Sequence, residues 1–205
     1  MRFILLLLVL CLGIPFAGAS TNLVIIGDSL SAGYGISAER AWPALLGHRL
    51  AEKGYDYSVR NLSISGETTA GGRSRLPMAL VKYRPKIVIL ALGANDGLRG
   101  LPLEQMDNNL RAMIAEIRRV GAKVLLVGMQ LPPNYGPYAT AFAKSFQDLS
   151  KESRIPLLPF LLAPIAEQRV FFQADQLHPT ADAQPLLLDH VWPALQPLLK
   201  PVGGR

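Results

Sequence analysis

The stretch Leu23-Val24-Ile25-Ile26-Gly27-Asp28-Ser29-Leu30 lies near the N-terminus and decides the fold. Its first five residues are apolar, partly β-branched and closed by a glycine, a pattern typical of a strand buried on both faces of a parallel sheet. Three similar runs follow, at residues 86–92, 123–128 and 155–158. A more polar run at 57–62 is expected nearer the sheet edge. The sequence therefore predicts five strands.

Segments with helical periodicity separate these strands. Apolar residues recur at three- and four-residue intervals, and glycines or prolines mark several ends, in residues 39–53, 103–120, 138–152 and 183–199. Residues 69–83 are a weaker helix candidate because they contain Gly71, Gly72 and Pro77. Strands that alternate with helices require crossover connections, which give a parallel sheet covered on both faces. We expect an α/β protein, a three-layer α/β/α sandwich with a central five-stranded parallel sheet.

Length and composition exclude several classes of protein. The chain has 205 residues, of which 50% are hydrophobic, enough to bury the core of one domain. Its 18 glycines and 16 prolines show no period, so collagen-like and low-complexity classes are excluded. The formal net charge is +6, but no run of basic residues is longer than two. We therefore expect no nucleic-acid partner.

The N-terminus has the pattern of a secretory signal peptide. Met1-Arg2 precedes an uncharged apolar run at 3–14, and Ala17-Gly18-Ala19 forms a small-residue cleavage site. The run is shorter than the ~20 residues that span a bilayer. We predict that residues 1–19 are cleaved, that 20–205 form a single domain, and that the protein is periplasmic or secreted. Cleavage removes Cys11, the only cysteine, whose preceding Leu10 also argues against lipidation.

Polar residues follow the predicted strands. Ligands of parallel sheets bind beyond the carboxyl ends of the strands. The first strand is followed by Asp28-Ser29, the second by Ser65-Gly66, the third by Asn95-Asp96, and Asp175 and His178 lie past the last. We expect these groups to meet at one edge of the sheet.

These residue types fit nucleophilic catalysis. A serine hydroxyl needs an imidazole to accept its proton, and the imidazole needs an acceptor on its other nitrogen. Backbone N–H groups at Ser29 and Gly66, with the amide of Asn95, suit a developing oxyanion. Taken singly, each residue also has a structural interpretation. Ser29 fits a helix cap, and Gly66 and Asn95 fit tight turns.

In combination, the four segments resemble the SGNH, or GDSL, hydrolase family over residues 23–199. The blocks are Gly27-Asp28-Ser29-Leu30, Gly66, Gly93-Ala94-Asn95-Asp96 and Asp175-Gln176-Leu177-His178. Within the family, the sequence looks most like secreted bacterial multifunctional acyl-CoA thioesterases, arylesterases and lysophospholipases. One departure is Ala183-Gln184-Pro185, where a glycine-rich helix start is expected.

The resemblance implies a flavodoxin-like SGNH fold and a carboxylic ester hydrolase. It makes Ser29 the nucleophile, His178 the base and Asp175 its orienting acid. Ser29, Gly66 and Asn95 would form the oxyanion hole. No cofactor and no metal are expected. The substrate would be a small acyl ester or thioester, such as an aryl ester, a lysophospholipid or a fatty acyl thioester. We further expect a monomer that makes transient contact with membrane lipid.

Some alternatives remain open from sequence. A carbohydrate acetyl esterase, or a non-catalytic secreted glycan-binding module of the same fold, would use many of the same polar groups. Residues 33–38 match a dinucleotide-binding fingerprint, but the first strand ends six residues too early for it. For the substrate, residues 73–78 and 131–138 are candidates for the walls of an acyl pocket, and the alternative is that they are ordinary connections.

Overall fold

The computed structural model describes residues 21–201 and contains a five-stranded parallel sheet. The strand order is β2-β1-β3-β4-β5, and all neighbours run parallel. The strands are β1 (Thr21–Gly27), β2 (Tyr57–Asn61), β3 (Ile87–Ala91), β4 (Lys123–Val127) and β5 (Leu157–Leu158). The more polar β2 lies at the edge, as its sequence predicts. The predicted signal peptide, residues 1–19, lies outside the described residues.

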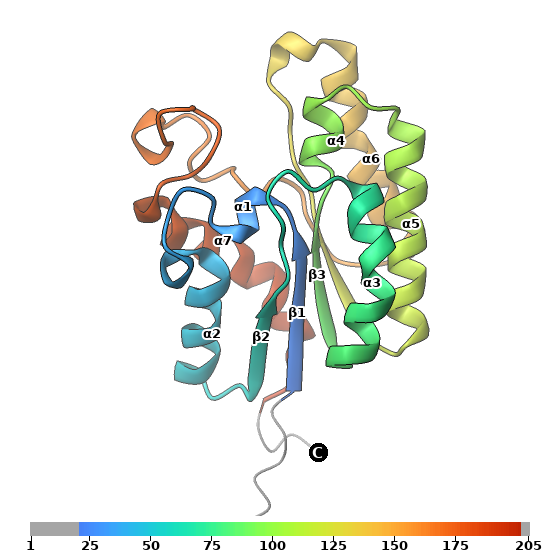
Figure 1. Cartoon of the computed structure of the whole chain (residues 1–205), viewed down its shortest axis with the longest axis vertical. Helices are drawn as coiled ribbons and strands as arrows, with labels where there is room; N and C mark the ends of the chain where they lie inside the picture. The colour runs from blue at the N-terminus through green and yellow to red at the C-terminus, as the bar shows by residue number, and fades with distance from the viewer. Residues whose placement is uncertain (1–20, 202–205) are drawn as a thin grey trace, which may run out of the picture.

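Helices cover both faces of this sheet (Figure 1). On one side α3 packs on α5 and α5 on α6, while α2 packs on α7 on the other. The long helices are α2 (Trp42–Glu52), α3 (Thr69–Tyr83), α5 (Leu103–Arg119), α6 (Pro137–Ser153) and α7 (Gln184–Leu195). Single 3-10 turns are η1 (Ala38–Arg40), η2 (Pro133–Tyr135), η3 (Arg169–Phe171), η4 (Ala181–Ala183) and η5 (Gln196–Leu198). The predicted three-layer sandwich is confirmed.

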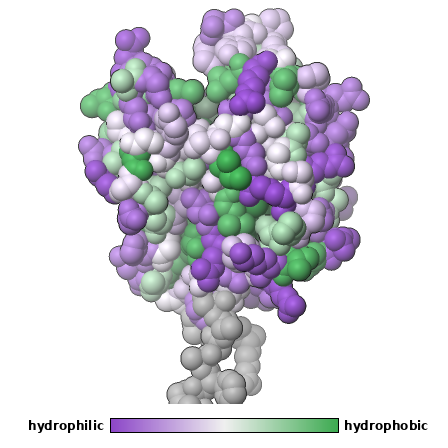
Figure 2. All heavy atoms as spheres, in the orientation of Figure 1, coloured by the Kyte–Doolittle hydropathy of each residue, from purple (hydrophilic) through white to green (hydrophobic). Residues whose placement is uncertain are grey.

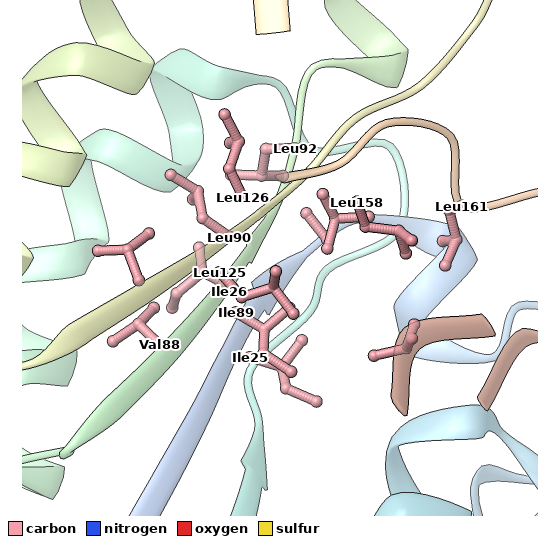
Figure 3. Close-up of a cluster of buried hydrophobic side chains, with 14 of the residues drawn as sticks. Ile25, Ile26, Val88, Ile89, Leu90, Leu92, Leu125, Leu126, Leu158 and Leu161 are labelled. Carbon is pink, nitrogen blue, oxygen red and sulfur yellow. The ribbon is translucent and has the colours of Figure 1, made fainter. Parts of the chain in front are cut away.

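The core lies between the sheet and both helix layers. All five residues of β3 are buried, which explains why its sequence is apolar throughout rather than alternating. Figure 3 shows how side chains from neighbouring strands interdigitate there, among them Ile25, Ile89, Leu125 and Leu158. This packing fixes the positions of the strand ends.

The sequence did not indicate two short helices, α1 (Ser29–Ala32) and α4 (Ala94–Leu98). Both begin within three residues of a strand end and are too short to display a helical period. Conversely, α3 forms in full despite its glycines and Pro77. Gly72 is needed there because a Cβ at this position would clash with the side chain of Leu92.

The unexpected start of α7 has a structural explanation. Gln184 is buried, and its Oε1 accepts a hydrogen bond from the Trp42 N–H at 3.0 Å. Its Nε2 donates to the Thr180 carbonyl at 3.2 Å. Gln184 therefore joins α7 to the start of α2, and Pro185 occupies the first turn, where a proline is tolerated. Within residues 21–201, no helix combines the length and apolar character needed to cross a bilayer.

Candidate active site

The turn from β1 into α1 presents Ser29 at the carboxyl edge of the sheet. Asp28, rather than Ser29, is the N-cap: its Oδ1 accepts a hydrogen bond from the Leu30 N–H at 3.0 Å. The capping interpretation of Ser29 is therefore wrong, and its hydroxyl is available for other contacts. Gly27 permits the turn, because a Cβ there would lie 2.9 Å from both the Ser31 Cβ and the Ser63 Oγ.

The structure brings Ser29, His178 and Asp175 together across 149 residues of sequence. His178 Nε2 lies 2.9 Å from Ser29 Oγ, and His178 Nδ1 lies 2.7 Å from Asp175 Oδ2. The other carboxylate oxygen, Oδ1, accepts the N–H groups of Leu177 at 2.9 Å and His178 at 3.0 Å. The imidazole is thus held between a hydroxyl and a carboxylate.

These contacts also lower the pKa of the Asp175 carboxyl group. The backbone N–H and the ring of His178, followed by the Leu177 N–H, lower the pKa of Asp175 to about 2. Hydrogen bonds to the charged form favour that form. Asp175 is therefore negatively charged at neutral pH, and the 41% exposure of its side chain to water also favours the charged form.

Two residues that sequence reasoning missed support the His178 loop. Gln173 donates its backbone N–H to the His178 carbonyl at 2.8 Å, and its Nε2 donates to the carbonyls of Tyr34 at 2.7 Å and Pro179 at 3.0 Å. The Tyr34 ring packs against the His178 ring, with 4.4 Å between centroids. Nothing in their residue types signals this role. Only their positions beside the quoted motifs point to it.

Three residues with hydrogen-bond donors line one hollow beside the Ser29 hydroxyl. Among the described residues, the backbone N–H groups of Ser29 and Gly66 have no acceptor. Gly66 has a φ of 78°, a conformation that favours glycine. Asn95 Nδ2 donates to the Glu67 carbonyl at 3.0 Å with one of its two hydrogens. Ser29, Gly66 and Asn95 all line the same hollow.

Helix α4 and the residue that ends it hold the Gly66 loop in place. Besides Asn95, Arg99 donates from Nη2 to the Gly66 carbonyl at 2.9 Å. Buried Asp96 accepts the Thr69 N–H at 2.9 Å and the Thr69 hydroxyl at 2.6 Å. Asn95 and the loop therefore form one hydrogen-bonded unit. The turn interpretation of residues 95–97 is wrong, since they form part of α4.

The hollow has a volume of about 130 Å³ and a largely apolar lining. The apolar contributors are Leu30, Tyr34, Ala94, Leu98, Met129 and Leu177. Neither predicted wall segment lines this hollow: residues 73–78 lie within α3, and residues 131–138 contribute no lining residue. Residues 131–138 instead contact a lining residue: the Tyr135 hydroxyl donates a hydrogen bond to the Leu98 carbonyl at 3.1 Å.

A second carboxylate beside the site behaves differently from Asp175. Burial raises the pKa of Asp28 to about 7, and the negative charges of Asp96 and Glu67 add to this effect. The hydrogen bond from the Leu30 N–H opposes it. Asp28 therefore changes protonation near neutral pH. Within residues 21–201, no group of three or more histidine, cysteine or acidic residues could hold a metal ion.

Comparison with known proteins shows the family of this chain. Residues 25–185 match the model of the GDSL-like Lipase/Acylhydrolase family. The chain belongs to this family. It is 43% identical to the thioesterase 1/protease 1/lysophospholipase L1 of Escherichia coli K12, over 89% of this chain and 87% of the relative. It is 41% identical to the arylesterase of Vibrio mimicus, over 93% and 95%.

A solved structure agrees with this assignment. The crystal structure of TesA matches with a TM-score of 0.85 at 48% identity, covering 87% of this chain and 100% of that one. The predicted SGNH resemblance, fold and enzyme class, a carboxylic ester hydrolase, are confirmed.

Proposed function

We propose that this family member hydrolyses acyl esters and thioesters with Ser29 as nucleophile, His178 as general base and Asp175 as the acid that orients it. The observation that carries the proposal is the position of the His178 ring. Its Nε2 is 2.9 Å from the Ser29 hydroxyl, while its Nδ1 is 2.7 Å from the Asp175 carboxylate. An activated serine nucleophile requires this arrangement.

The reaction proceeds in two steps. Ser29 Oγ attacks the carbonyl carbon while His178 Nε2 takes the hydroxyl proton. The oxyanion that forms accepts hydrogen bonds from the N–H groups of Ser29 and Gly66 and from the amide of Asn95. The C–O or C–S bond then breaks, and His178 returns the proton to the departing alkoxide or thiolate. His178 Nε2 then takes a proton from water, which attacks the acyl carbon. The bond between this carbon and Ser29 Oγ breaks, the acid leaves, and His178 returns the proton to Ser29 Oγ.

Asp175 acts through the imidazole. Because its pKa is about 2, it stays charged and accepts the Nδ1–H of His178 throughout the cycle. This fixes the tautomer in which Nε2 faces Ser29 and stabilises the imidazolium that forms. Asp28, in contrast, caps α1 and takes no proton from the substrate.

The apolar lining of the hollow supports acyl substrates, and the relatives named thioesterase, lysophospholipase and arylesterase support the range. We therefore propose aryl esters, lysophospholipids and fatty acyl thioesters as substrates. The same proposal includes a periplasmic or secreted location and cleavage of residues 1–19. It also includes a single monomeric domain at 20–205 and transient contact of this domain with membrane lipid. N-terminal sequencing of the exported protein tests the cleavage. Sedimentation equilibrium tests the monomer.

The experiment is hydrolysis of p-nitrophenyl esters of increasing chain length by the protein of residues 20–205. Ser29→Ala is run in parallel, and Ser74→Ala on the outer side of α3 is the matched control. We expect turnover that Ser29→Ala abolishes and Ser74→Ala retains. A phosphonate ester should add covalently to Ser29, which mass spectrometry of the labelled peptide detects.

Two results would change the assignment. Full turnover by folded Ser29→Ala would exclude Ser29 as the nucleophile. Activity confined to acetyl esters would favour the carbohydrate acetyl esterase. A glycan-binding module would not hydrolyse any ester and has no need of a hydrogen bond between His178 and Ser29.

A further inference from the structure

The lower end of α3 exposes large apolar side chains. Met78 is 79% exposed and Val81 76%, and their spacing of three residues places them on one face of the helix. Val120, which follows α5, is 44% exposed. A hollow of about 460 Å³ adjoins them, lined by Leu80, Val81, Arg84, Pro85, Lys86 and Val120. In Figure 2, hydrophobic residues bordered by hydrophilic ones appear over this end of α3.

The charged residues next to Met78 and Val81 in the sequence are all basic. Between Glu67 and Asp96 the sequence contains no acidic residue. Lys82, Arg84 and Lys86 surround the apolar side chains, and no carboxylate among residues 21–201 forms an ion pair with them. Basic residues at a helix C-terminus offset its dipole. The helix dipole therefore explains basic residues at this end of α3, but it gives no reason for the apolar side chains of Met78 and Val81 to be exposed.

We propose that this surface, formed by Met78, Val81, Lys82, Lys86 and Val120, docks on bilayers that contain anionic phospholipids. Exposed apolar side chains beside lysine and arginine favour binding at the membrane interface. Here they gather in the C-terminal half of α3, so this end, rather than the whole helix, contacts the bilayer. Anionic headgroups complement the unpaired positive charge, and the apolar side chains enter the headgroup region. The inference rests on the membrane contact in the proposed function and names the surface that makes it.

The placement of the surface determines which lipids reach Ser29. The Gly66 loop precedes the first residue of α3, so the docking surface and the active-site hollow lie at opposite ends of this helix. Met78 is nine residues from Thr69, the first residue of α3, or about 14 Å along the helix axis, and Val81 is twelve residues away, or about 18 Å. The active site is therefore held away from the bilayer. It acts on single lipids that leave the membrane, such as lysophospholipids, rather than on lipids still packed within it.

Vesicle co-sedimentation tests the surface without measuring hydrolysis. The protein of residues 20–205 is mixed with phosphatidylcholine vesicles with and without phosphatidylglycerol. We expect binding only when phosphatidylglycerol is present, and weaker binding as salt rises. Lys82→Gln combined with Lys86→Gln should lower the partition coefficient roughly 20- to 30-fold. Val81→Ser should lower it about fivefold.

Matched controls change the same properties elsewhere. Lys144→Gln with Lys151→Gln, on α6, removes the same net charge, and Val170→Ser, outside α3, removes another exposed valine. Both should bind as the wild type does. All variants should keep their rate on a soluble p-nitrophenyl ester, because none of these residues lines the active-site hollow. That rate also verifies folding.

Four results would overturn the proposal. The first is equal binding to vesicles with and without phosphatidylglycerol. The second is a loss of binding in the Lys144→Gln, Lys151→Gln variant as large as in the Lys82→Gln, Lys86→Gln variant. The third is a dimer that Val81→Ser dissociates, which would make a second copy the occupant. A failure to bind vesicles, with normal esterase activity, would overturn the docking surface and leave the proposed esterase activity intact. Normal binding to vesicles by a protein that hydrolyses no ester would support the docking surface and overturn the proposed esterase activity.

Discussion

Asp28 makes the stability of this protein depend on pH in an unusual direction. Burial raises its pKa from 3.8 to about 7. Between these values the folded protein binds a proton that the unfolded chain has released. Stability from this group is therefore greatest below pH 3.8, falls as pH rises through the window, and is constant above about 7. At ~1.4 kcal/mol per pH unit, deprotonation in the folded state costs about 4 kcal/mol in total.

The perturbation is Asp28→Asn. The amide keeps an oxygen that accepts the Leu30 N–H, so the N-cap of α1 is retained, but the ionisable group is lost. Every other titrating group contributes equally to the unfolding free energies of the variant and the wild type. Its contribution therefore drops out when one free energy is subtracted from the other. We expect this difference to move in favour of the amide variant by about 3 kcal/mol between about pH 5 and about pH 8.

Urea unfolding followed by the fluorescence of buried Trp42 and Trp192 measures the difference. Asp28→Ala is the control. It should lose the same pH dependence, but at every pH it should also be less stable than the amide variant by about 1 kcal/mol, because it lacks the cap. A difference between Asp28→Asn and wild type that is the same at both pH values would refute the argument that burial controls this carboxyl.

Three further predictions concern the active site. Asn95→Ala should lower kcat by about 10²–10³ with little change in KM, because it removes one oxyanion donor; full turnover in steady-state assays would contradict this. Asp175→Asn should lower kcat by roughly 10⁴. Since the pKa of Asp175 is about 2, its contribution to stability is complete above pH 3.8 and is lost only as pH falls through about 2, which acid titration by circular dichroism measures. Asp96→Ala should destabilise the protein by about 1–3 kcal/mol in urea and reduce kcat more than it changes KM, because Thr69 loses both hydrogen bonds and the Gly66 loop loosens. An unchanged kcat would place Asp96 outside the support of that loop.

The architecture could be predicted because burial on both faces leaves a clear mark in sequence. β1, β3 and β4 are apolar runs, and the amphipathic pattern of α5 gives its start at Leu103 directly. β5 shrinks to Leu157–Leu158, because sheet pairing with β4 covers only these two residues. Of the predicted apolar run at 155–158, Leu158 is buried, Ile155 and Leu157 are half-buried, and Pro156 is exposed.

The candidate site was predictable where chemistry and topology coincide. Ser29, His178 and Asp175 are chemically distinctive and follow strands whose carboxyl ends share one edge. Local geometry was harder to predict. Asp28 and Ser29 are both good helix caps, and only the structure distinguishes them. Leu98 and Met129 look like ordinary apolar residues, so their position in the hollow depends on loop paths that no periodicity describes.

The proposed oxyanion donors depart from three adjacent strands. Ser29 follows β1, Gly66 follows β2 and Asn95 follows β3, and β1 pairs directly with both others, Gly27 opposite Ala91 and Ile25 opposite Asn61. Hydrogen-bonded strands keep a spacing of ~4.8 Å. The sheet therefore sets where the three segments begin, and the hydrogen bonds of Asn95, Asp96 and Arg99 fix the Gly66 loop, whereas the other loops around the hollow do not take part. Those loops are free to vary in length and apolar content, so substrate range can diverge among relatives while the part that stabilises the oxyanion keeps its dimensions.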